Sequence, residues 1–554
     1  MSTTPFQTST TTEQSVVWMH REAPLTTFGD IETELMAFER AERQRLGIGT
    51  KEPTHWQDPN PVRFERSERA TTTLLFGGLT QMQDSLIQGA LEGLGYRAQA
   101  LETPDNDALR VGREFGNRGQ CNPTYFTVGN LVKHLCELRD SKGMTTEAIV
   151  ADYIFLTAGA CGPCRFGTYA TEYRKALRDA GFHGFRVLLF QQQGGLRQAC
   201  GTDVGLELSP RFFVAVLKAV MAGDVLNVMG YRLRPYETEQ GATDAALARA
   251  RQLVREALAN RRSVAVALLQ CRSILRRVVV DRLVAKPKVS IIGEFWAMTT
   301  EGDGNYRLQR FLESEGAEVD IQPISGWLLY NIWQVRWDTL RRLELRGADP
   351  ERQGLAGKKP HQRLWQLRAA DLALRCVFKT YAYLVGLKHY SLPDLELVAT
   401  VAHPYYDNQL RGGEGHMEVG KLIQTVEHNK AHLVVSVKPF GCMPSSGVSD
   451  GVQSLVTERY PKAIFCAIET TGDGAANAHS RVMMDLFKAR AVARAEFAAA
   501  LGRRGLDLSA VRRSTAGQRI WADALHYPRA QGIAGTAARL VAELPVRGLF
   551  GKTT

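Results

Sequence analysis

The sequence lacks the segments by which membrane and secreted proteins are recognised. No apolar run approaches the roughly 20 residues that a membrane span needs. The first residues, MSTTPFQTSTTTEQ, do not show the basic-then-apolar pattern of a secretory signal. We therefore expect a cytoplasmic protein that does not act at a membrane.

A nucleotide-phosphate loop is also missing. None of the Gly-rich segments has the GxxxxGK[ST] pattern, and no convincing dinucleotide fingerprint is present. ATP hydrolysis by this chain alone is therefore not expected. The net charge of +11 suits an anionic partner, but no recognisable nucleic-acid module accompanies it, so nucleic acid is not the favoured partner.

Cysteine is scarce, and its placement is informative. Nine cysteines in 554 residues do not suggest a disulfide framework in a reducing cytosol. Thiolates displayed on tight loops can converge on a soft metal ion or an iron–sulfur cluster. Five cysteines stand beside or close to Gly or Pro in turn-like sequence: Cys121, Cys161, Cys164, Cys200 and Cys442. The other four lie in helix- or strand-like apolar patterns, where cysteine packs as a small hydrophobe: Cys136, Cys271, Cys376 and Cys466.

Apolar runs that alternate with amphipathic stretches predict an α/β protein with parallel sheets and crossover helices. The runs are TTLLFG, RAQAL, DYIFLTAG and FRVLLFQ, then KVSIIGEFW, EVDIQP, LVATVAHPYY, AHLVVSVKPF and KAIFCAIET. We expect two doubly wound parallel-sheet domains facing a cleft. The predicted organisation is a polar, charged and partly helical N-terminal arm (1–70), a first α/β domain (71–243), a helical connector (244–284), a second α/β domain (285–480) and a helical C-terminal extension (481–554).

The turn cysteines fall where such sheets bind ligands, because loops after parallel strands lie at their carboxyl ends. Cys161 and Cys164 directly follow DYIFLTAG, and Cys442 follows AHLVVSVKPF. Three kinds of site compete. A thioredoxin-like pair would leave Cys121 and Cys442 unexplained, and a zinc site usually shows two close pairs. An iron–sulfur cluster assembled from distant loops fits the spacing best, with plain structural thiols as the remaining alternative.

Polar residues in Gly-rich sequence supply candidates for the cleft. Glu294 directly follows a predicted strand. The segment AHPYYDNQLRGGEGHMEVGK gathers His403, Tyr405, Asp407, Asn408, Arg411, Glu414, His416 and Glu418 before a helix. We take Arg411, Glu414 and His416 as possible cleft residues. A loop whose side chains only cap the following helix is the alternative interpretation.

At these motifs the chain resembles proteins related to CoA-substrate-specific enzyme activases, within the 2-hydroxyacyl-CoA dehydratase and benzoyl-CoA reductase superfamily. The resemblance covers roughly Thr71 to Leu486. It rests on CNPTYFTVGNLVKHL, CGPCRFGTY, GEFW, GGEGHMEVGKL and especially KPFGCMPS. Two departures are that this is one fused-looking chain and that it carries a CxxC where simpler subunits use isolated cysteines.

The resemblance implies an oxygen-sensitive protein with a [4Fe-4S] or double-cubane cluster. It carries the ligand role to Cys121, Cys161, Cys164 and Cys442, with Cys200 as a further candidate. It also implies a separate ATPase with its own [4Fe-4S] cluster, which would deliver low-potential electrons for reduction or dehydration of a small molecule such as an acyl-CoA. Two alternatives stay open: a cluster-binding relay or assembly subunit without its own substrate, and a zinc-stabilised nucleic-acid-binding protein. A homo- or hetero-oligomer is compatible with each.

Overall fold

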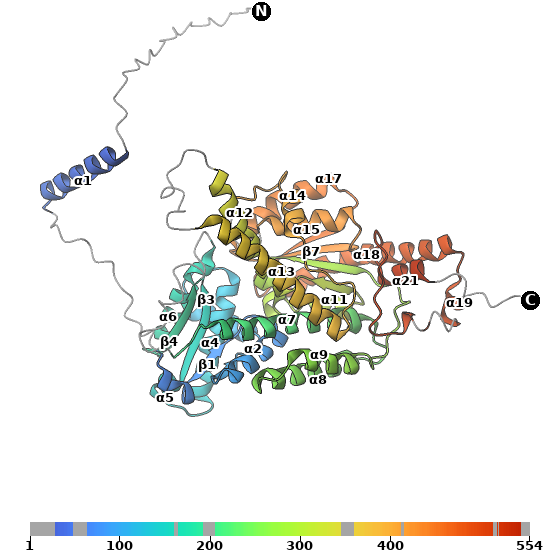
Figure 1. The fold of residues 1–554 in the computed structure, drawn as a ribbon, viewed down its shortest axis with the longest axis horizontal. Helices are drawn as coiled ribbons and strands as arrows, with labels where there is room; N and C mark the ends of the chain where they lie inside the picture. The colour runs from blue at the N-terminus through green and yellow to red at the C-terminus, as the bar shows by residue number, and fades with distance from the viewer. Residues whose placement is uncertain are drawn as a thin grey trace, which may run out of the picture. The chain divides into compact units, whose positions relative to one another are not determined.

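The computed structural model describes residues 28–47, 64–159, 164–191, 205–344, 359–410, 415–513, 518 and 520–544. Contacts divide the chain into two units, Met1–Pro59 and Asn60–Thr554. The first unit contains α1 (Phe28–Arg45), which covers the charged stretch of the predicted N-terminal arm. The other described helices and strands all belong to the second unit (Figure 1).

The second unit contains two four-stranded parallel sheets with the same strand order. The first sheet has the order β2-β1-β3-β4 and consists of β1 (Thr73–Phe76), β2 (Arg97–Ala100), β3 (Tyr153–Gly159) and β4 (Arg186–Gln191). The second sheet has the order β6-β5-β7-β8 and consists of β5 (Lys288–Gly293), β6 (Glu318–Ile321), β7 (Leu433–Pro439) and β8 (Phe465–Thr470). In each sheet the first strand lies between the second and the third, so the chain reverses direction across the sheet. The expected α/β class with parallel strands is confirmed.

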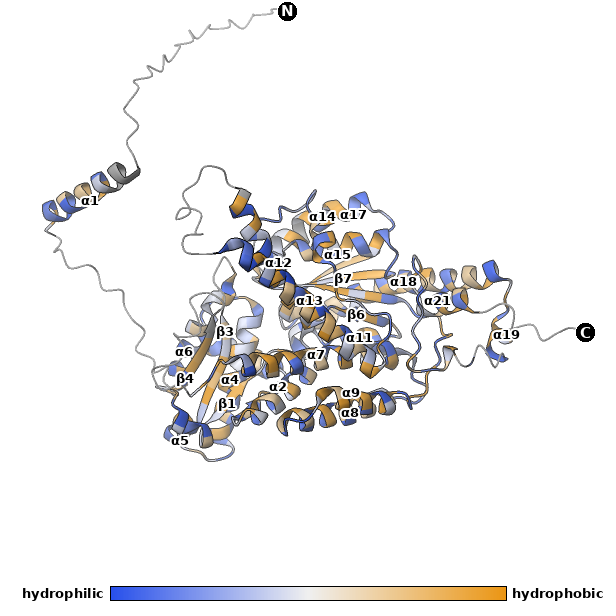
Figure 2. Ribbon diagram, in the orientation of Figure 1, coloured by the Kyte–Doolittle hydropathy of each residue, from blue (hydrophilic) through white to orange (hydrophobic). Residues whose placement is uncertain are grey.

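The strands form where the apolar runs predicted them, because both faces of these sheets are covered. Every residue of β7 is buried, as is usual for a parallel strand with helices on both sides. Figure 2 shows largely apolar strands such as β1 and β7, whereas helices such as α5 (Thr146–Asp152) mix apolar and polar residues. Because helices cover both faces of the sheets, the strands have continuous apolar runs and not an alternating apolar–polar pattern.

The prediction of one strand was wrong. LVATVAHPYY forms α14 (Leu395–Ala402) and the turn after it, not a strand. The Asp394 side chain caps this helix by accepting hydrogen bonds from the backbone N–H groups of Glu396 and Leu397. This cap, together with packing on the next helix, α15 (His416–Glu427), outweighs the strand preference of the Val and Thr residues.

Register places the ends of three strands of the second sheet at one edge. Gly293 of β5 is paired with Val437 of β7, and Pro439 of β7 is paired with Thr470 of β8. Gly293 has φ +129°, and a Cβ there would lie 2.0 Å from the Val437 carbonyl oxygen. Only glycine permits this turn so close to β7. The residue after it, Glu294, therefore starts at the carboxyl edge of the sheet.

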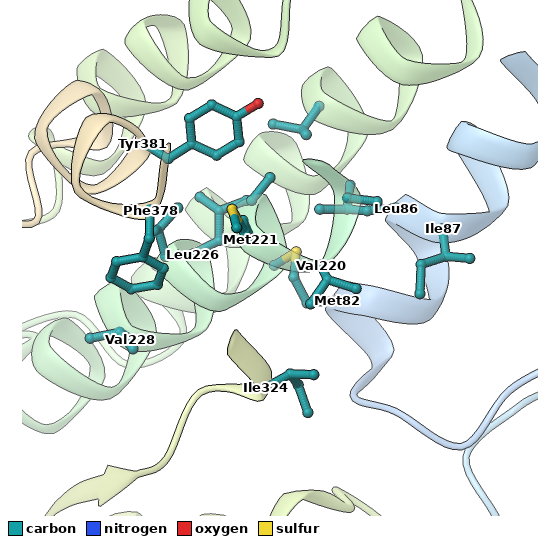
Figure 3. Packing of buried hydrophobic residues seen from close by; sticks show 14 of the residues in the cluster. Met82, Leu86, Ile87, Val220, Met221, Leu226, Val228, Ile324, Phe378 and Tyr381 are labelled. Carbon is teal, nitrogen blue, oxygen red and sulfur yellow. The ribbon is translucent and has the colours of Figure 1, made fainter. Parts of the chain in front are cut away.

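The second unit has two halves, a first half built on the first sheet and a second half built on the second sheet. Helices from both halves form the largest hydrophobic core of this unit. The helices in this core include α2 (Gln81–Gly93), α7 (Pro210–Leu233), α8 (Ala242–Ala259), α9 (Val264–Leu275), α12 (Ile324–Glu344) and α13 (Pro360–Val385). Figure 3 shows Leu86 of α2, Met221 and Leu226 of α7, and Phe378 of α13 meeting there. Each such side chain, fully buried, contributes about 1.5–3 kcal/mol, so this core joins the two halves tightly.

The described residues include one helix that is long and apolar enough to cross a membrane. It is Pro210–Tyr236, which combines α7 with η4 (Arg234–Tyr236), and 61% of its most apolar stretch is buried inside the protein. Asp224, in the middle of α7, is 2% exposed and accepts hydrogen bonds from Ser325 and Gln83. The packing is that of a core helix. The sequence reading missed this segment because Lys218 and Asp224 interrupt its apolar residues.

The remaining helices surround the sheets and build the C-terminal part. In the first half they are α3 (Asn106–Phe115), α4 (Asn122–Asp140), η2 (Arg165–Thr168) and α6 (Tyr169–Asp179). After β5 and β7 come α10 (Phe295–Thr299), α11 (Leu308–Ser314), α16 (Met443–Ser446), η6 (Gly447–Val452) and α17 (Gln453–Arg459). The C-terminal part has α18 (Ala475–Arg504), α19 (Leu508–Arg513) and α21 (Thr536–Glu543).

Candidate functional site

The structure brings two of the predicted cysteine loops together. Cys121 is the residue before α4, and Cys442 is the residue before α16, just after β7. The backbone N–H of Asn122 donates a hydrogen bond to the carbonyl oxygen of Phe440 at 2.9 Å. Gly441 has φ +77°, and a Cβ added there would lie 3.2 Å from the Cα of Cys121. The loops of the two cysteines, each 7% exposed, thus meet although one precedes a helix of the first half and the other follows a strand of the second sheet.

The Cys121 thiol lies between two hydroxyl groups. Its Sγ is 3.1 Å from Oγ1 of Thr124 and 3.2 Å from Oη of Tyr169, the first residue of α6. Burial, reinforced by the neighbouring Cys121, holds the pKa of Tyr169 well above its usual range. The Tyr169 phenol therefore keeps its proton at neutral pH and can donate a hydrogen bond.

Cys164 stands on the turn that leads to Tyr169. It precedes η2, and the backbone N–H of Phe166 points at its Sγ at 3.5 Å. The Phe166 ring packs edge-on against the Tyr169 ring, with centroids 5.0 Å apart. The turn that holds Cys164 is thus connected to Cys121 through Tyr169. Four predicted site residues lie outside the described residues: Cys161, Cys200, Arg411 and Glu414.

Glu294 lies at the carboxyl edge of the second sheet, where the sequence placed it. Its backbone N–H donates to the Val437 carbonyl at 2.9 Å, and its carboxylate accepts from the N–H of Ala297 at 2.9 Å. Burial raises the pKa of Glu294 in spite of this cap. Its negative charge also helps to raise the pKa values of Tyr169 and Glu418, so Glu294 acts electrostatically on both.

Glu418 is the acidic residue of α15 that faces the Cys442 helix. It is 2% exposed, and its carboxyl group is bonded to the hydroxyl of Ser445 at 3.3 Å and to the amide of Gln453 at 3.4 Å. Burial raises the pKa of Glu418 to about 8, and the charge of Glu294 adds to this effect. Glu418 is therefore largely protonated at pH 7. In the sequence, Glu418 belongs to the polar segment, but the predicted cleft residues there are Arg411, Glu414 and His416.

His416, which the sequence put in the cleft, packs in an aromatic cluster. It is 1% exposed, with ring centroids 5.6 Å from Tyr330 and 4.5 Å from Trp333. Burial lowers the pKa of His416 to about 4, so the ring is neutral at physiological pH. Its Nε2 has no hydrogen-bond partner among the described residues, and neither has Nε1 of Trp333. The described contacts of the His416 ring are with these aromatic side chains and not with the cysteines.

Buried polar atoms without a hydrogen-bond partner gather near the contact of the two cysteine loops. Within the described ranges they include Oε1 of Gln120, Nδ2 of Asn122 and Oγ1 of Thr470. Gln120 and Asn122 flank Cys121, and the Thr470 carbonyl accepts from the Phe440 N–H at 3.0 Å. A buried polar atom left unsatisfied costs about 1–3 kcal/mol. Several at one place indicate a site that contacts a bound group or water. Sequence patterns gave no signal for these amides and hydroxyls, apart from their positions beside the cysteine motifs.

Side chains from both halves pack around this site and form a seam. Hydrogen bonds cross it from Gln81 N–H to Glu301 at 2.7 Å, from Asn106 N–H to Asp303 at 3.0 Å, and from Arg113 to the Thr471 carbonyl at 2.6 Å. The rings of Phe126 and Trp296 also meet there, with centroids 5.6 Å apart. The helices α3 and α4 of the first half thus sit on the loops that follow β5 and β8 of the second sheet.

The described thiols supply part of a soft-metal donor set. Among the residues that the structure describes, no disulfide is present, and no group of three or more His, Cys, Asp or Glu side chains stands close enough to bind a metal ion. Thiolates are suitable ligands for zinc or for an iron–sulfur cluster. Cys121 and Cys442 are two described thiols whose loops are in contact.

A pocket of about 10 Å³ lies elsewhere, at the start of α12. Thr80, Asp224, Asn227 and Gln322 are among the residues that line it. This volume is about that of one water molecule, so the pocket suits a buried water and not a substrate.

Comparison with protein families finds no family that matches this chain, and comparison with curated proteins finds no similar sequence.

Proposed function

We propose that this chain is an iron–sulfur redox protein whose centre is held by Cys121, Cys161, Cys164 and Cys442, with Cys200 as a further ligand. The observation that carries the proposal is the contact between the Cys121 and Cys442 loops, which come from different halves of the protein. A cluster that bridges two α/β halves would need ligands from both, and the meeting of these two loops beside the carboxyl edge of the second sheet supports such a site.

The surroundings of the two thiols suit a buried charged centre. Each thiol precedes a helix, and Cys121 has two hydroxyl groups at hydrogen-bond distance. Hydrogen bonds to sulfur and low solvent exposure tune the potential of such centres. When bound, a [4Fe-4S] or double-cubane cluster supplies one-electron transfer. The protonated Glu418 adds no negative charge next to it at pH 7.

The electrons would come from a separate ATPase that carries its own [4Fe-4S] cluster, because the sequence has no phosphate loop for ATP. The resemblance at the cysteine motifs supports this partner, and it supports a cytoplasmic, oxygen-sensitive component for reduction or 2-hydroxyacyl-CoA dehydratase-like dehydration of a small molecule such as an acyl-CoA. The chain would accept one electron at a time and hold the centre away from water.

A second role is favoured by the packed seam. Described side chains of the two halves are in direct contact at the seam, as Phe126 and Trp296 are, and the pocket at α12 is the size of one water. An electron-relay or assembly subunit needs no substrate cavity. Turnover of an acyl-CoA with the matching ATPase and a reductant separates the two roles, since only the reductase consumes the thioester.

The test is the iron, acid-labile sulfide and zinc content of anaerobically purified full-length protein, with an electron paramagnetic resonance spectrum after reduction. We expect iron with matching sulfide, and a loss of bound iron in Cys121→Ser and Cys442→Ser. The matched control is Cys376→Ser, because Cys376 is exposed on α13. Equal iron in all three variants contradicts the ligand assignment. Zinc without iron supports the zinc-stabilised alternative instead.

A further inference from the structure

We infer that the hydroxyl groups of Tyr169 and Thr124 donate hydrogen bonds to the sulfur of Cys121 and thereby raise the reduction potential of the centre. The inference rests on the proposed function. It extends that function by naming the two side chains that control how readily the site accepts an electron.

Both hydroxyl groups are fixed in place. Thr124 is 1% exposed, and its backbone N–H bonds to the Cys121 carbonyl at 3.0 Å in the first turn of α4. Helix geometry therefore sets the 3.1 Å distance from its hydroxyl to Sγ. Tyr169 begins α6, and the edge-on packing of Phe166 holds its ring. Both side chains are buried, so neither rotates freely in solvent and both stay near the Cys121 sulfur.

The direction of donation follows from charge. A thiolate that binds a metal has no proton, so it can only accept hydrogen bonds. A tyrosine phenol carries a hydroxyl proton below about pH 10, and that of Tyr169 lies within hydrogen-bond distance of Sγ. A hydroxyl that bonds to the Cys121 thiolate must therefore be the donor, and both hydroxyls lie within reach of Sγ. Such charge-assisted bonds strengthen when reduction places more negative charge on sulfur, so they favour the reduced state.

The same helix offers a matched control one turn further along. Tyr173 is also buried, and burial raises its pKa to about 12. Its hydroxyl is bonded to Thr127 and Thr157, and not to a sulfur. Tyr173→Phe thus removes one buried phenol hydroxyl from α6 without removing a donor from Cys121.

The experiment is a redox titration of anaerobically purified full-length protein, followed by electron paramagnetic resonance, with iron and sulfide measured in every sample. We expect Tyr169→Phe and Thr124→Val each to lower the equilibrium constant for one-electron reduction about tenfold, a fall of about 59 mV. The bound iron should stay unchanged. Thr124→Ser, which keeps the hydroxyl, and Tyr173→Phe should retain the wild-type potential.

The outcomes separate this inference from the function on which it rests. Wild-type protein without iron refutes the proposed function. Wild-type iron with the same potential in Tyr169→Phe, Thr124→Val and Tyr173→Phe overturns the inference and leaves the proposed function intact. If Tyr169→Phe does not fold, the difference between Thr124→Val and Thr124→Ser decides alone: a lower potential in the valine variant supports the inference, and equal potentials overturn it.

Discussion

The backbone N–H of Asn122 and the carbonyl oxygen of Phe440 are hydrogen-bonded at 2.9 Å, which ties the start of α4 to the loop after β7. Each of these residues lies next to or near a cysteine, Cys121 on one side and Cys442 on the other. A main-chain bond does not depend on side-chain identity, so it fixes the approach of the two loops whichever group the thiols bind. The residue types at the contact, such as Gly441, then determine how closely the two loops can approach.

Gly441→Ala should separate the two cysteine loops. Gly441 has φ +77°, and the added Cβ would press on the Cα of Cys121 at 3.2 Å. Left-handed backbone costs a non-glycine residue about 1–3 kcal/mol. We expect a free energy of unfolding lower by about 1–3 kcal/mol in urea titrations. Gly447→Ala is the control, because its φ is −65° and nothing lies within 4 Å of an added Cβ; equal losses in the two variants would show that the close approach is unimportant.

Glu418→Gln should make the protein less sensitive to rising pH. The pKa of Glu418 is raised from 4.5 to about 8 by burial, so the folded state binds this proton more tightly than the unfolded state does. Its stabilising effect is complete below pH 4.5 and is lost as pH rises through 8. At about 1.4 kcal/mol per pKa unit, the full loss is on the order of 5 kcal/mol. Glutamine keeps the bonds of Ser445 and Gln453 without titrating.

The measurement for Glu418 is the difference in unfolding free energy between pH 5 and pH 8, compared for wild type and variant. Buried acids that do not interact with Glu418 contribute the same slope to both proteins, so the comparison reports Glu418 together with its electrostatic interaction with Glu294. Glu427→Gln, an exposed position of the same helix, should behave as wild type. A Glu418→Gln protein with an unchanged pH slope would mean that Glu418 ionises normally in the fold.

Asp224→Ala should destabilise the contact between the halves more than an ordinary substitution does. The Asp224 carboxylate accepts from the N–H groups of Ile324 and Ser325 at 2.9 and 2.7 Å, and from the Ser325 hydroxyl at 2.6 Å. Alanine would leave these buried donors unsatisfied, at about 1–3 kcal/mol each. We expect a loss of at least about 3 kcal/mol in thermal or urea unfolding. Asp371→Ala, which removes a part-exposed ion pair with Arg375, should cost under about 1 kcal/mol.

The sheets could be predicted from the sequence because parallel strands covered on both faces leave continuous apolar runs, as β7 does. The run that became α14 misled because its strand-like Val and Thr residues are outweighed by the Asp394 cap just before it and by packing on α15. A capping residue can be recognised in the sequence only when a helix is already predicted after it. For α7, the buried Asp224 hid an apolar helix because its partner, Ser325, is remote in sequence.

At the site, the sequence found the residue types but not their partners. Glycine and proline near Cys121 and Cys442 indicated turns. The predicted strand before the Cys442 loop also placed Cys442 at a sheet edge. The contact between these loops depends on how two halves pack, which no spacing encodes. Tyr169 carried no signal of its own except its position five residues after Cys164. His416 shows the opposite error, since a histidine in Gly-rich sequence proved to be packed among aromatic rings.

Glu496→Gln should loosen the C-terminal part from the second sheet. The His432 Nδ1 accepts from the Lys288 N–H at 2.9 Å, so its Nε2 carries the proton and donates to Glu496 at 3.1 Å. The Glu496 carboxylate also accepts from the N–H groups of Ala534 and Gly535, which precede α21. Burial acts to raise the pKa of Glu496, but these bonds, led by that of His432, lower it to about 2.

Because this folded-state pKa lies below the ordinary 4.5, the contribution of Glu496 is present above pH 4.5 and is lost as pH falls through 2. The shift corresponds to a contribution on the order of 3 kcal/mol at neutral pH. We expect Glu496→Gln to lose most of it at pH 7 and to differ little from wild type at pH 2. Hydrogen exchange should speed up first in α21. Glu458→Gln, on α17, is the control; if both variants exchange α21 at the wild-type rate, the carboxylate does not hold this helix on the sheet.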